Sequence, residues 1–413
     1  MLHTPAIFRA KSRRGTVAIL VALCLTLLVG IVAIALDGGL LLDNRRNVQA
    51  AADAAALAAA ADLFNNYPIN NGLDPSNTAG QAGVANAAAN GFVNGDGVST
   101  VVVNIPPISG AFEGQAGYAE VIVTYKQPRY FSNVFGAAPL PVRARAVARG
   151  MWTPFNNGVI VLHPTAAGSL SANGNGDVKV QFASIIVDSN NSQAATTVGN
   201  SFVADPSKPV AITGKNPGYS GNFQATMYTG QPATPDPLAY IPAPDPTSMT
   251  AQTAGGGQAV SLQPGYYALG LHFSGQTTVT MAPGIYYVNG TFDFSGQGNL
   301  NATGVMIYAT GGLSITGNGS VTLSPPTTGI YTGITYFQAR NSAATAKIAG
   351  NGNYNVTGTV YAAGGLADLQ GNGDASIASQ VVSLLMVAGG NGQTNIVWAG
   401  PPSARTRRIQ LVE

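Results

Sequence analysis

The chain has 413 residues, of which 9% are charged and 46% are hydrophobic, which excludes disorder of the charged, weakly hydrophobic kind. Nineteen Lys and Arg residues balance 17 Asp and Glu residues at a net charge of +2. No overall field exists that would gather nucleic acid, and we expect no nucleic-acid partner. Three histidines and a single cysteine, Cys24, exclude a disulfide framework and a Cys/His zinc cluster. We predict no metal site and no cofactor.

The chain begins with a basic segment, residues 1–15, followed by a charge-free run over residues 16–36. The run matches the roughly 20 residues that a helix needs to cross a bilayer. A helix is also the only single segment that satisfies its own backbone in lipid. The positive-inside rule then places the N-terminus in the cytoplasm and the bulk of the chain outside, in the periplasm or at the cell surface. The cations that give this orientation are Arg9, Lys11, Arg13 and Arg14.

A cleaved signal peptide is the alternative for this run. Ala33-Ile34-Ala35 has the small-x-small form of a cleavage site. The run is longer than the roughly 7–15 residues of a signal-peptide core, however, and it continues into a helix-forming segment. We therefore favour a transmembrane helix over residues 16–36, with the lipid bilayer as its partner.

Small side chains recur every four residues along the predicted membrane helix. Such a ridge lets a second helix approach closely, so that van der Waals contact drives association in lipid. Membrane helices are also generally rich in Ala and Gly, and the sequence leaves both interpretations open. The ridge consists of Ala18, Ala22, Thr26 and Gly30.

Residues 37–151 predict an Ala-rich helix and a small α+β domain. Leu40 to Leu63 is dominated by Ala, the best helix former. It could continue the membrane helix as one rod with a bend at Gly38-Gly39. A second helix is expected over Ala79 to Gly91. Three strand-like runs follow, and the clear alternation of the last two predicts a sheet with one buried face. The runs are Val98–Ile105, Ala119–Tyr125 and Pro141–Ala148.

Cations alternate along the last of these strands. Arg143, Arg145 and Arg149 could form a basic stripe that attracts anionic lipid or polysaccharide. We favour an ordinary solvated face, because exposure is the usual state of arginine.

The sequence from the first arginines to the Ala-rich helix resembles the N-terminal region of TadE/TadG-like proteins of the tight-adherence (Flp) pilus assembly system. A basic Arg-Arg-Gly, a charge-free span, an Asp-Gly, an Arg pair and a Gln followed by an Ala-rich run occur in that order over about 50 residues. The matching residues are Arg13, Arg14, Gly15, Asp37, Gly38, Arg45, Gln49, Ala51, Asp53, Ala54, Ala55, Leu57 and Ala58. The resemblance implies a component of pilus assembly or anchoring whose partners are other pilus-assembly or pseudopilin proteins.

One position departs from the processed pseudopilins of that system. They are cut after a glycine that is followed five residues later by Glu, whereas Leu20 stands at that offset from Gly15. The departure favours a stably anchored accessory protein over a subunit that is extracted into the fibre.

Residues 158–400 predict an all-β, right-handed parallel β-helix, a solenoid. Gly-x-Gly turns recur between short β-branched runs, and the offsets from position 296 are 21, 33, 21 and 19 residues. A period near 20 fits one coil of a solenoid. A Pro-rich insertion at 205–257 would be a surface excursion or cap, and residues 401–413 form a tail. The turns are Gly174-Asn175-Gly176, Gly296-Gln297-Gly298, Gly317-Asn318-Gly319, Gly350-Asn351-Gly352, Gly371-Asn372-Gly373 and Gly390-Asn391-Gly392.

Enzymes built on parallel β-helices process polysaccharides with acids clustered on one solvent face. Residues 158–400 contain no Glu, and their Asp residues never occur as Asp-Asp or Asp-x-Asp. We therefore predict no catalytic residues and a non-enzymatic scaffold or contact protein, for which a surface polysaccharide is a further possible partner. The alternatives are a β-helix polysaccharide-processing enzyme and a surface adhesin that is independent of any pilus.

Overall fold

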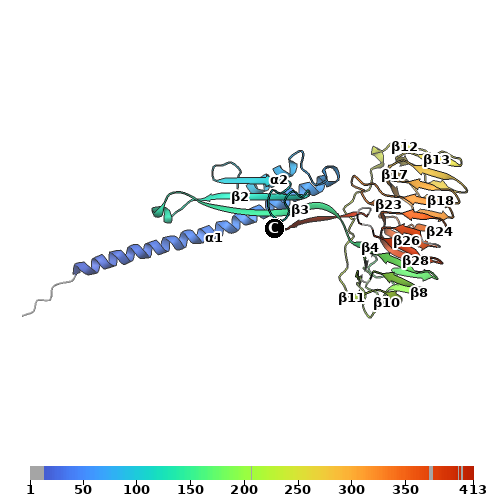
Figure 1. Ribbon diagram of the computed structural model, residues 1–413, viewed down its shortest axis with the longest axis horizontal. Coiled ribbons are helices and arrows are strands. Elements are labelled where there is room, and N and C mark those ends of the chain that lie inside the picture. The colour runs from blue at the N-terminus through green and yellow to red at the C-terminus, as the bar shows by residue number, and fades with distance from the viewer. Residues whose placement is uncertain (1–13, 206, 372–374, 399, 401–402) are drawn as a thin grey trace, which may run out of the picture. The chain divides into compact units, whose positions relative to one another are not determined.

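The computed structural model describes residues 14–205, 207–371, 375–398, 400 and 403–413 (Figure 1). The chain divides into two compact units. Unit 1 contains the chain up to Met151 together with Arg408–Glu413, and unit 2 contains Trp152–Arg407. The element order confirms the predicted fold class: a long apolar helix, a small α/β region and a large all-parallel β-solenoid. The right-handed sense of the solenoid stays a prediction.

The apolar run and the Ala-rich segment form one helix, α1 (Arg14–Asn70), of 57 residues. The helix continues through Gly38 and Gly39, where we expected a bend. Each glycine costs about 1 kcal/mol relative to alanine. Strong helix formers on both sides offset that cost, because helix propagation is cooperative.

The rest of unit 1 is a short helix and an antiparallel sheet whose strand order is β1-β2-β3-β30. The Ala-rich part of α1 packs on one face of this sheet. Small residues allow a close approach: a Cβ added at Gly150 of β3 would lie 1.8 Å from the Ala60 carbonyl oxygen. The elements are α2 (Thr78–Ala89), β1 (Ser99–Asn104), β2 (Tyr118–Gln127), η1 (Ser132–Phe135), β3 (Leu140–Pro154) and β30 (Arg405–Leu411).

The solenoid of unit 2 consists of ten coils, which we number in chain order. Coils 1 to 3 comprise β4 (Asn157–Val161), β5 (Leu170–Gly174) and β6 (Val178–Gln181); β7 (Ser184–Val187) and β8 (Gln193–Ala204); and β9 (Val210–Ile212) and β10 (Gly218–Gln224). The next strand, β11 (Met227–Thr229), stacks on β9 beyond coil 3. Coils 4 to 6 comprise β12 (Ala251–Gln252) and β13 (Ala259–Leu262); β14 (Gly265–Tyr267), β15 (Leu271–Phe273) and β16 (Thr278–Met281); and β17 (Gly284–Val288), β18 (Phe292–Gly296) and β19 (Leu300–Ala302). Coils 7 to 10 comprise β20 (Val305–Ala309), β21 (Leu313–Gly317) and β22 (Val321–Leu323); β23 (Ile334–Gln338), β24 (Ala346–Gly350) and β25 (Tyr354–Val356); β26 (Thr359–Gly371) and β27 (Ala375–Ala378); and β28 (Gln380–Gly390) and β29 (Thr394–Val397).

The coils do not stack in chain order. Coils 4 to 10 follow one another, but coil 10 then pairs with coil 1, because β28 lies beside β4 and β5, and β29 lies beside β6. The stack is therefore 4-5-6-7-8-9-10-1-2-3, with the first coil of the sequence inside it. Coils 3 and 4 are consecutive in sequence and lie at opposite ends.

Residues 230–250, which we call the connector, join these two ends. Within the expected insertion 205–257, strands β9, β10 and β12 belong to coils, and β11 stacks on β9 at the end of coil 3. The Pro-rich remainder forms the connector with η2 (Pro246–Ser248). Leu238 and Ile241 of the connector are buried against outward-facing aromatic side chains of the coils. The sheet that contains β20 and β23 therefore packs against the solenoid core on its inner side and against the connector on its outer side. This explains why β20 and β23 are buried at every position.

The Gly-x-Gly turns form a column along the stack. Gly296, Gly317, Gly350 and Gly371 pair in register, and Gly390 pairs with Gly174. Backbones approach so closely here that a Cβ at Gly319 would lie 1.6 Å from the Gly298 carbonyl oxygen. Asn372 and Gly373 of the predicted repeat lie outside the described residues.

Candidate functional site

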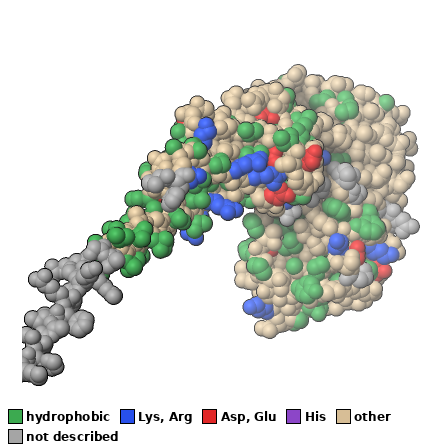
Figure 2. Space-filling view, turned by 60° about the vertical axis from the view of Figure 1, so that its left-hand side comes forward, with side chains coloured by type: hydrophobic (Ala, Val, Ile, Leu, Met, Phe, Trp, Pro, Cys, Tyr) green, Lys and Arg blue, Asp and Glu red, His purple; other side chains and the backbone are tan. Residues whose placement is uncertain are grey.

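The first candidate site is the apolar half of α1. Its large aliphatic side chains, from Val17 to Leu36, are 47–68% exposed. Figure 2 shows hydrophobic side chains over this projecting helix. An apolar surface over roughly 20 residues is long enough to cross the hydrocarbon core of a bilayer. One helix of the described chain is long and apolar enough to cross a membrane, which is compatible with a single-pass anchor.

The predicted small-residue ridge lies on this helix. Ala18, Ala22 and Thr26 are exposed, and the Thr26 hydroxyl donates to the Ala22 carbonyl at 2.6 Å. A Cβ added at Gly30 would meet nothing within 4 Å, so the packing of this chain does not require glycine there. The role of the ridge in helix pairing stays a prediction.

Most of the cations that predict the orientation of the chain in the membrane precede the described residues. Arg9, Lys11 and Arg13 lie outside the described residues, and Arg14 is described only as the first residue of α1. The cytoplasmic placement of the N-terminus therefore stays a prediction.

The second candidate site is the junction between α1 and the sheet of unit 1. Seven residues of α1 between Val48 and Ala60 are at most 1% exposed; they are Val48, Ala51, Ala52, Ala55, Ala56, Ala59 and Ala60. Gln49 donates to the Arg145 carbonyl at 3.1 Å and to Asp53 at 2.7 Å. The Ala-rich segment that carries the family resemblance thus forms the contact between α1 and the sheet.

Arg145, the central cation of the suggested basic stripe, is not a free cation. Arg145 donates to Glu120 at 2.6 Å and is also paired with Glu413, which follows β30. Glu120 is fully buried and also accepts from Asn104 at 2.7 Å and from Ser109 at 2.5 Å. Burial raises the pKa of Glu120, but these donors outweigh the burial and hold its pKa at about 2. The centre of the proposed stripe is therefore a neutralised ion-pair network.

A third candidate is the column of polar side chains on the face formed by β15, β18, β21, β24 and β26. His272 Nδ1 lies 3.8 Å from Asp293, and Lys347 Nζ lies 3.2 Å from Asp368. Each pair joins neighbouring coils, and the side chains of His272 and Asp293 are 65% and 30% exposed. In register the column reads His272, Asp293, Ser314, Lys347, Asp368.

The spacing of this column bears on carbohydrate chemistry. Asp293 and Asp368 are three coils apart, which is roughly 14 Å at the usual strand spacing. Glycosidase carboxylates lie roughly 5–10 Å apart. Asp293 and Asp368 are therefore farther apart than the two carboxylates of a glycosidase. Four further aspartates in the described solenoid each accept a hydrogen bond from another residue of unit 2; the pairs are Asp188 with Thr234, Asp205 with Ser207, Asp236 with Tyr361 and Asp245 with Thr247.

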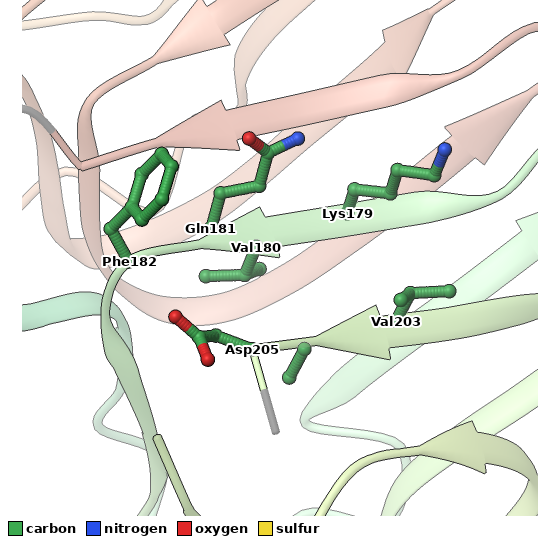
Figure 3. A pocket seen from close by; sticks show the side chains of 7 residues that line it. Lys179, Val180, Gln181, Phe182, Val203 and Asp205 are labelled. Carbon is green, nitrogen blue, oxygen red and sulfur yellow. The ribbon is translucent and has the colours of Figure 1, made fainter. Parts of the chain in front are cut away.

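A hollow of about 250 Å³ lies between β6 and β8 (Figure 3). Its walls are mainly apolar, with Lys179, Gln181 and Asp205 as the polar members. Asp205 accepts from the Ser207 hydroxyl at 2.7 Å, and this bond lowers the pKa of Asp205. No three His, Cys, Asp or Glu residues cluster as metal ligands in the parts of the chain that the structure describes.

Sequence reasoning missed the loop between β2 and β3. Asp37 of α1 accepts backbone hydrogen bonds from Phe131 at 3.2 Å and from Ser132 at 2.6 Å. Tyr130 and Phe131, which we call the aromatic tip of the loop, are 61% and 53% exposed. The adjacent aromatic pair was the available signal, but its position beside α1 depends on a contact across more than 90 residues of sequence.

Residues 15–62 match the family model Tad, described as "Putative Flp pilus-assembly TadE/G-like". The match confirms the resemblance read from the sequence, and it covers the apolar and Ala-rich parts of α1. No curated protein matches the chain, and no solved structure matches it.

Proposed function

We propose that this protein is a membrane-anchored, extracytoplasmic component of Flp (tight-adherence) pilus assembly or anchoring, and that it acts as a non-enzymatic scaffold. The observation that carries the proposal is the Tad match at residues 15–62, which coincides with the helix whose apolar half is exposed. The other half of that helix is committed to packing in unit 1. A helix that is half lipid-facing and half structural anchors a folded domain directly at a membrane.

The solenoid is proposed as the contact surface of the scaffold. Parallel stacking gives it long, flat faces, and the column from His272 to Asp368 presents polar groups at regular spacing. Other pilus-assembly or pseudopilin proteins are the proposed partners, and a surface polysaccharide would fit the same polar groups. A role for Arg9, Lys11, Arg13 and Arg14 in fixing a cytoplasmic N-terminus belongs to the proposal.

The proposal is tested by deleting the gene in its own host and counting surface pili by electron microscopy. We expect fewer pili, restored by the full chain and not by Leu27→Asp, because a carboxylate at the centre of a membrane helix costs about 3 kcal/mol. Leu42→Asp is the matched control, since Leu42 is equally exposed on α1 but lies beyond residue 36.

Two outcomes would overturn the proposal in favour of its rivals. Normal pili with lost surface attachment would identify a pilus-independent adhesin. Normal pili with an accumulated, undegraded surface polymer would identify a polysaccharide-processing enzyme. Protease added to intact spheroplasts provides a separate test of topology, and it should digest the solenoid.

A further inference from the structure

We propose that the loop between β2 and β3, residues 128–139, is a second membrane contact that inserts its aromatic tip into the lipid headgroup region beside α1. The inference rests on the transmembrane placement of α1 in the proposed function. Its partner is the bilayer surface itself.

The loop is fixed at the level where the charge-free run ends. Asp37 is the first charged residue after that run, and it is only 9% exposed because the loop covers it. Its carboxylate accepts from two consecutive backbone N–H groups, those of Phe131 and Ser132. The tip therefore stays at one height along α1.

The loop also reaches into the apolar run. Helix η1 packs on α1, and Ala33, one turn before Asp37, is only 8% exposed. Ala18, Ala22 and Ala35 on the same helix are exposed, so the burial of Ala33 reflects cover by a neighbouring segment. A segment that covers Ala33 lies inside the layer that residues 16–36 define.

The chemistry of the tip suits this layer. Tyr130 and Phe131 are more than half exposed, and the backbone of Phe131 is bound to Asp37 of the apolar helix. Tyrosine, with an apolar ring and a polar hydroxyl, is enriched at the membrane–water interface, and Phe inserts on the apolar side of that layer. Arg129 donates to the Ala138 carbonyl at 2.8 Å, which closes the base of the loop and keeps a cation at headgroup level.

The test uses the full chain in vesicles of phosphatidylethanolamine and phosphatidylglycerol. Cys24 is the only cysteine, so Cys24→Ser gives a background for a polarity-sensitive label at Phe131→Cys or, independently, Tyr130→Cys. Ile108→Cys is the matched control: it is 65% exposed and its N–H donates to Glu120, roughly 24 Å of strand away from Gln127.

At positions 130 and 131 we expect a blue-shifted emission, quenching by lipids that carry a shallow spin label, and loss of quenching by aqueous iodide. At position 108 we expect the reverse. Asp37→Ala removes the acceptor for both N–H groups and should shift the label at 131 towards water.

Retention in carbonate-washed vesicles with iodide quenching at 131 equal to that at 108 would overturn the tip contact and leave the anchor standing. Extraction of the protein by carbonate would overturn both.

Discussion

Gly390 pairs in register with Gly174, although Gly174 belongs to the first coil of the solenoid in sequence and Gly390 to the last. The side chains of the adjacent residues meet as well, since Asn175 donates to Asn391 at 3.5 Å across 216 residues of sequence. This seam joins two segments, coils 4–10 and coils 1–3, into one core. The points where the chain enters and leaves the solenoid therefore lie in the middle of the stack, away from its two ends.

The seam predicts a strong effect of a single methyl group. In Gly174→Ala the new Cβ would lie 2.5 Å from the Gly390 carbonyl oxygen, at a φ of +122° that alanine rarely adopts. We expect the free energy of unfolding of the solenoid to fall by about 2–4 kcal/mol, from overpacking and backbone strain together.

Gly275→Ala is the control for Gly174→Ala. Gly275 also has a positive φ, of +72°, but a Cβ there meets nothing within 4 Å. Chemical denaturation should show a clearly smaller loss for Gly275→Ala. Equal losses would mean that backbone strain alone, and not contact across the seam, determines stability.

One cation, Arg340, helps to hold the connector on the solenoid. Arg340 donates to the carbonyls of Leu238 at 2.7 Å and Ile241 at 2.9 Å, and its guanidinium lies 5.0 Å from the centre of the Phe337 ring. Arg340→Ala leaves both carbonyls without this donor, at a cost of about 1–3 kcal/mol. We expect limited proteolysis within residues 230–250 to become faster.

Lys347→Ala serves as the comparison for Arg340→Ala. The substitution removes the ion pair between Lys347 and Asp368. The Lys347 side chain is 41% exposed, and ion pairs of exposed side chains contribute little to the free energy of unfolding. Cleavage in the connector should stay at the native rate in Lys347→Ala. Faster cleavage in both variants would argue that the connector responds to global stability only.

Stability of unit 1 is expected to depend on acid through Glu120. Its folded pKa of about 2 lies below the ordinary value of 4.5 because Ser109, Arg145 and Asn104 donate to a carboxylate that burial alone would neutralise. A lowered folded pKa contributes stability that is complete above pH 4.5 and is lost as the pH falls towards 2.

Hydrogen exchange of β1 and β2 between pH 7 and pH 2.5 measures this contribution. In Glu120→Gln the acid-dependent part should disappear, and stability at pH 7 should fall by about 1–3 kcal/mol because the Arg145 pairing is lost. An unchanged pH profile in this variant would contradict the assignment.

Much of this architecture could be predicted from the sequence because its signals are local. The apolar run and the Ala-rich helix are continuous stretches of sequence, and the Gly-x-Gly turns recur at a spacing near 21 residues. The turn at Gly174 has the same Gly-x-Gly pattern. The order in which the coils stack has no such local signal. The sequence around Gly174 would be the same whether coil 1 packed against coil 10, as it does, or only against coil 2.

The contacts that define the candidate sites also join distant segments. Arg145 meets Glu413 across 268 residues, and Asp37 meets Ser132 across 95. His272 and Asp293 come together only once the coil length is fixed. Periodicity predicts which face a residue occupies, but the partner on that face depends on the completed fold.

Asp188 should behave in the opposite way to Glu120. It is 5% exposed and accepts from the Thr234 N–H at 2.9 Å, and burial raises its pKa. An acid whose folded pKa is raised destabilises the fold above that pKa and ceases to do so below its unfolded value. We therefore expect Asp188→Asn to be at least as stable as the native chain at pH 7. Asp188→Ala, which removes the acceptor, should be less stable, and chemical denaturation distinguishes the two.

The continuous helix through Gly38 and Gly39 leads to a functional prediction. An added Cβ at either position meets nothing within 4 Å, so Gly38→Ala/Gly39→Ala replaces two weak helix formers without a clash. Each substitution should stabilise α1, which is already continuous there, by up to about 1 kcal/mol. If α1 acts as a rigid rod, pilus counts in the host should match those of the native chain. Normal folding and membrane retention with fewer pili would mean that pilus assembly requires α1 to bend at these glycines, and would contradict the rod.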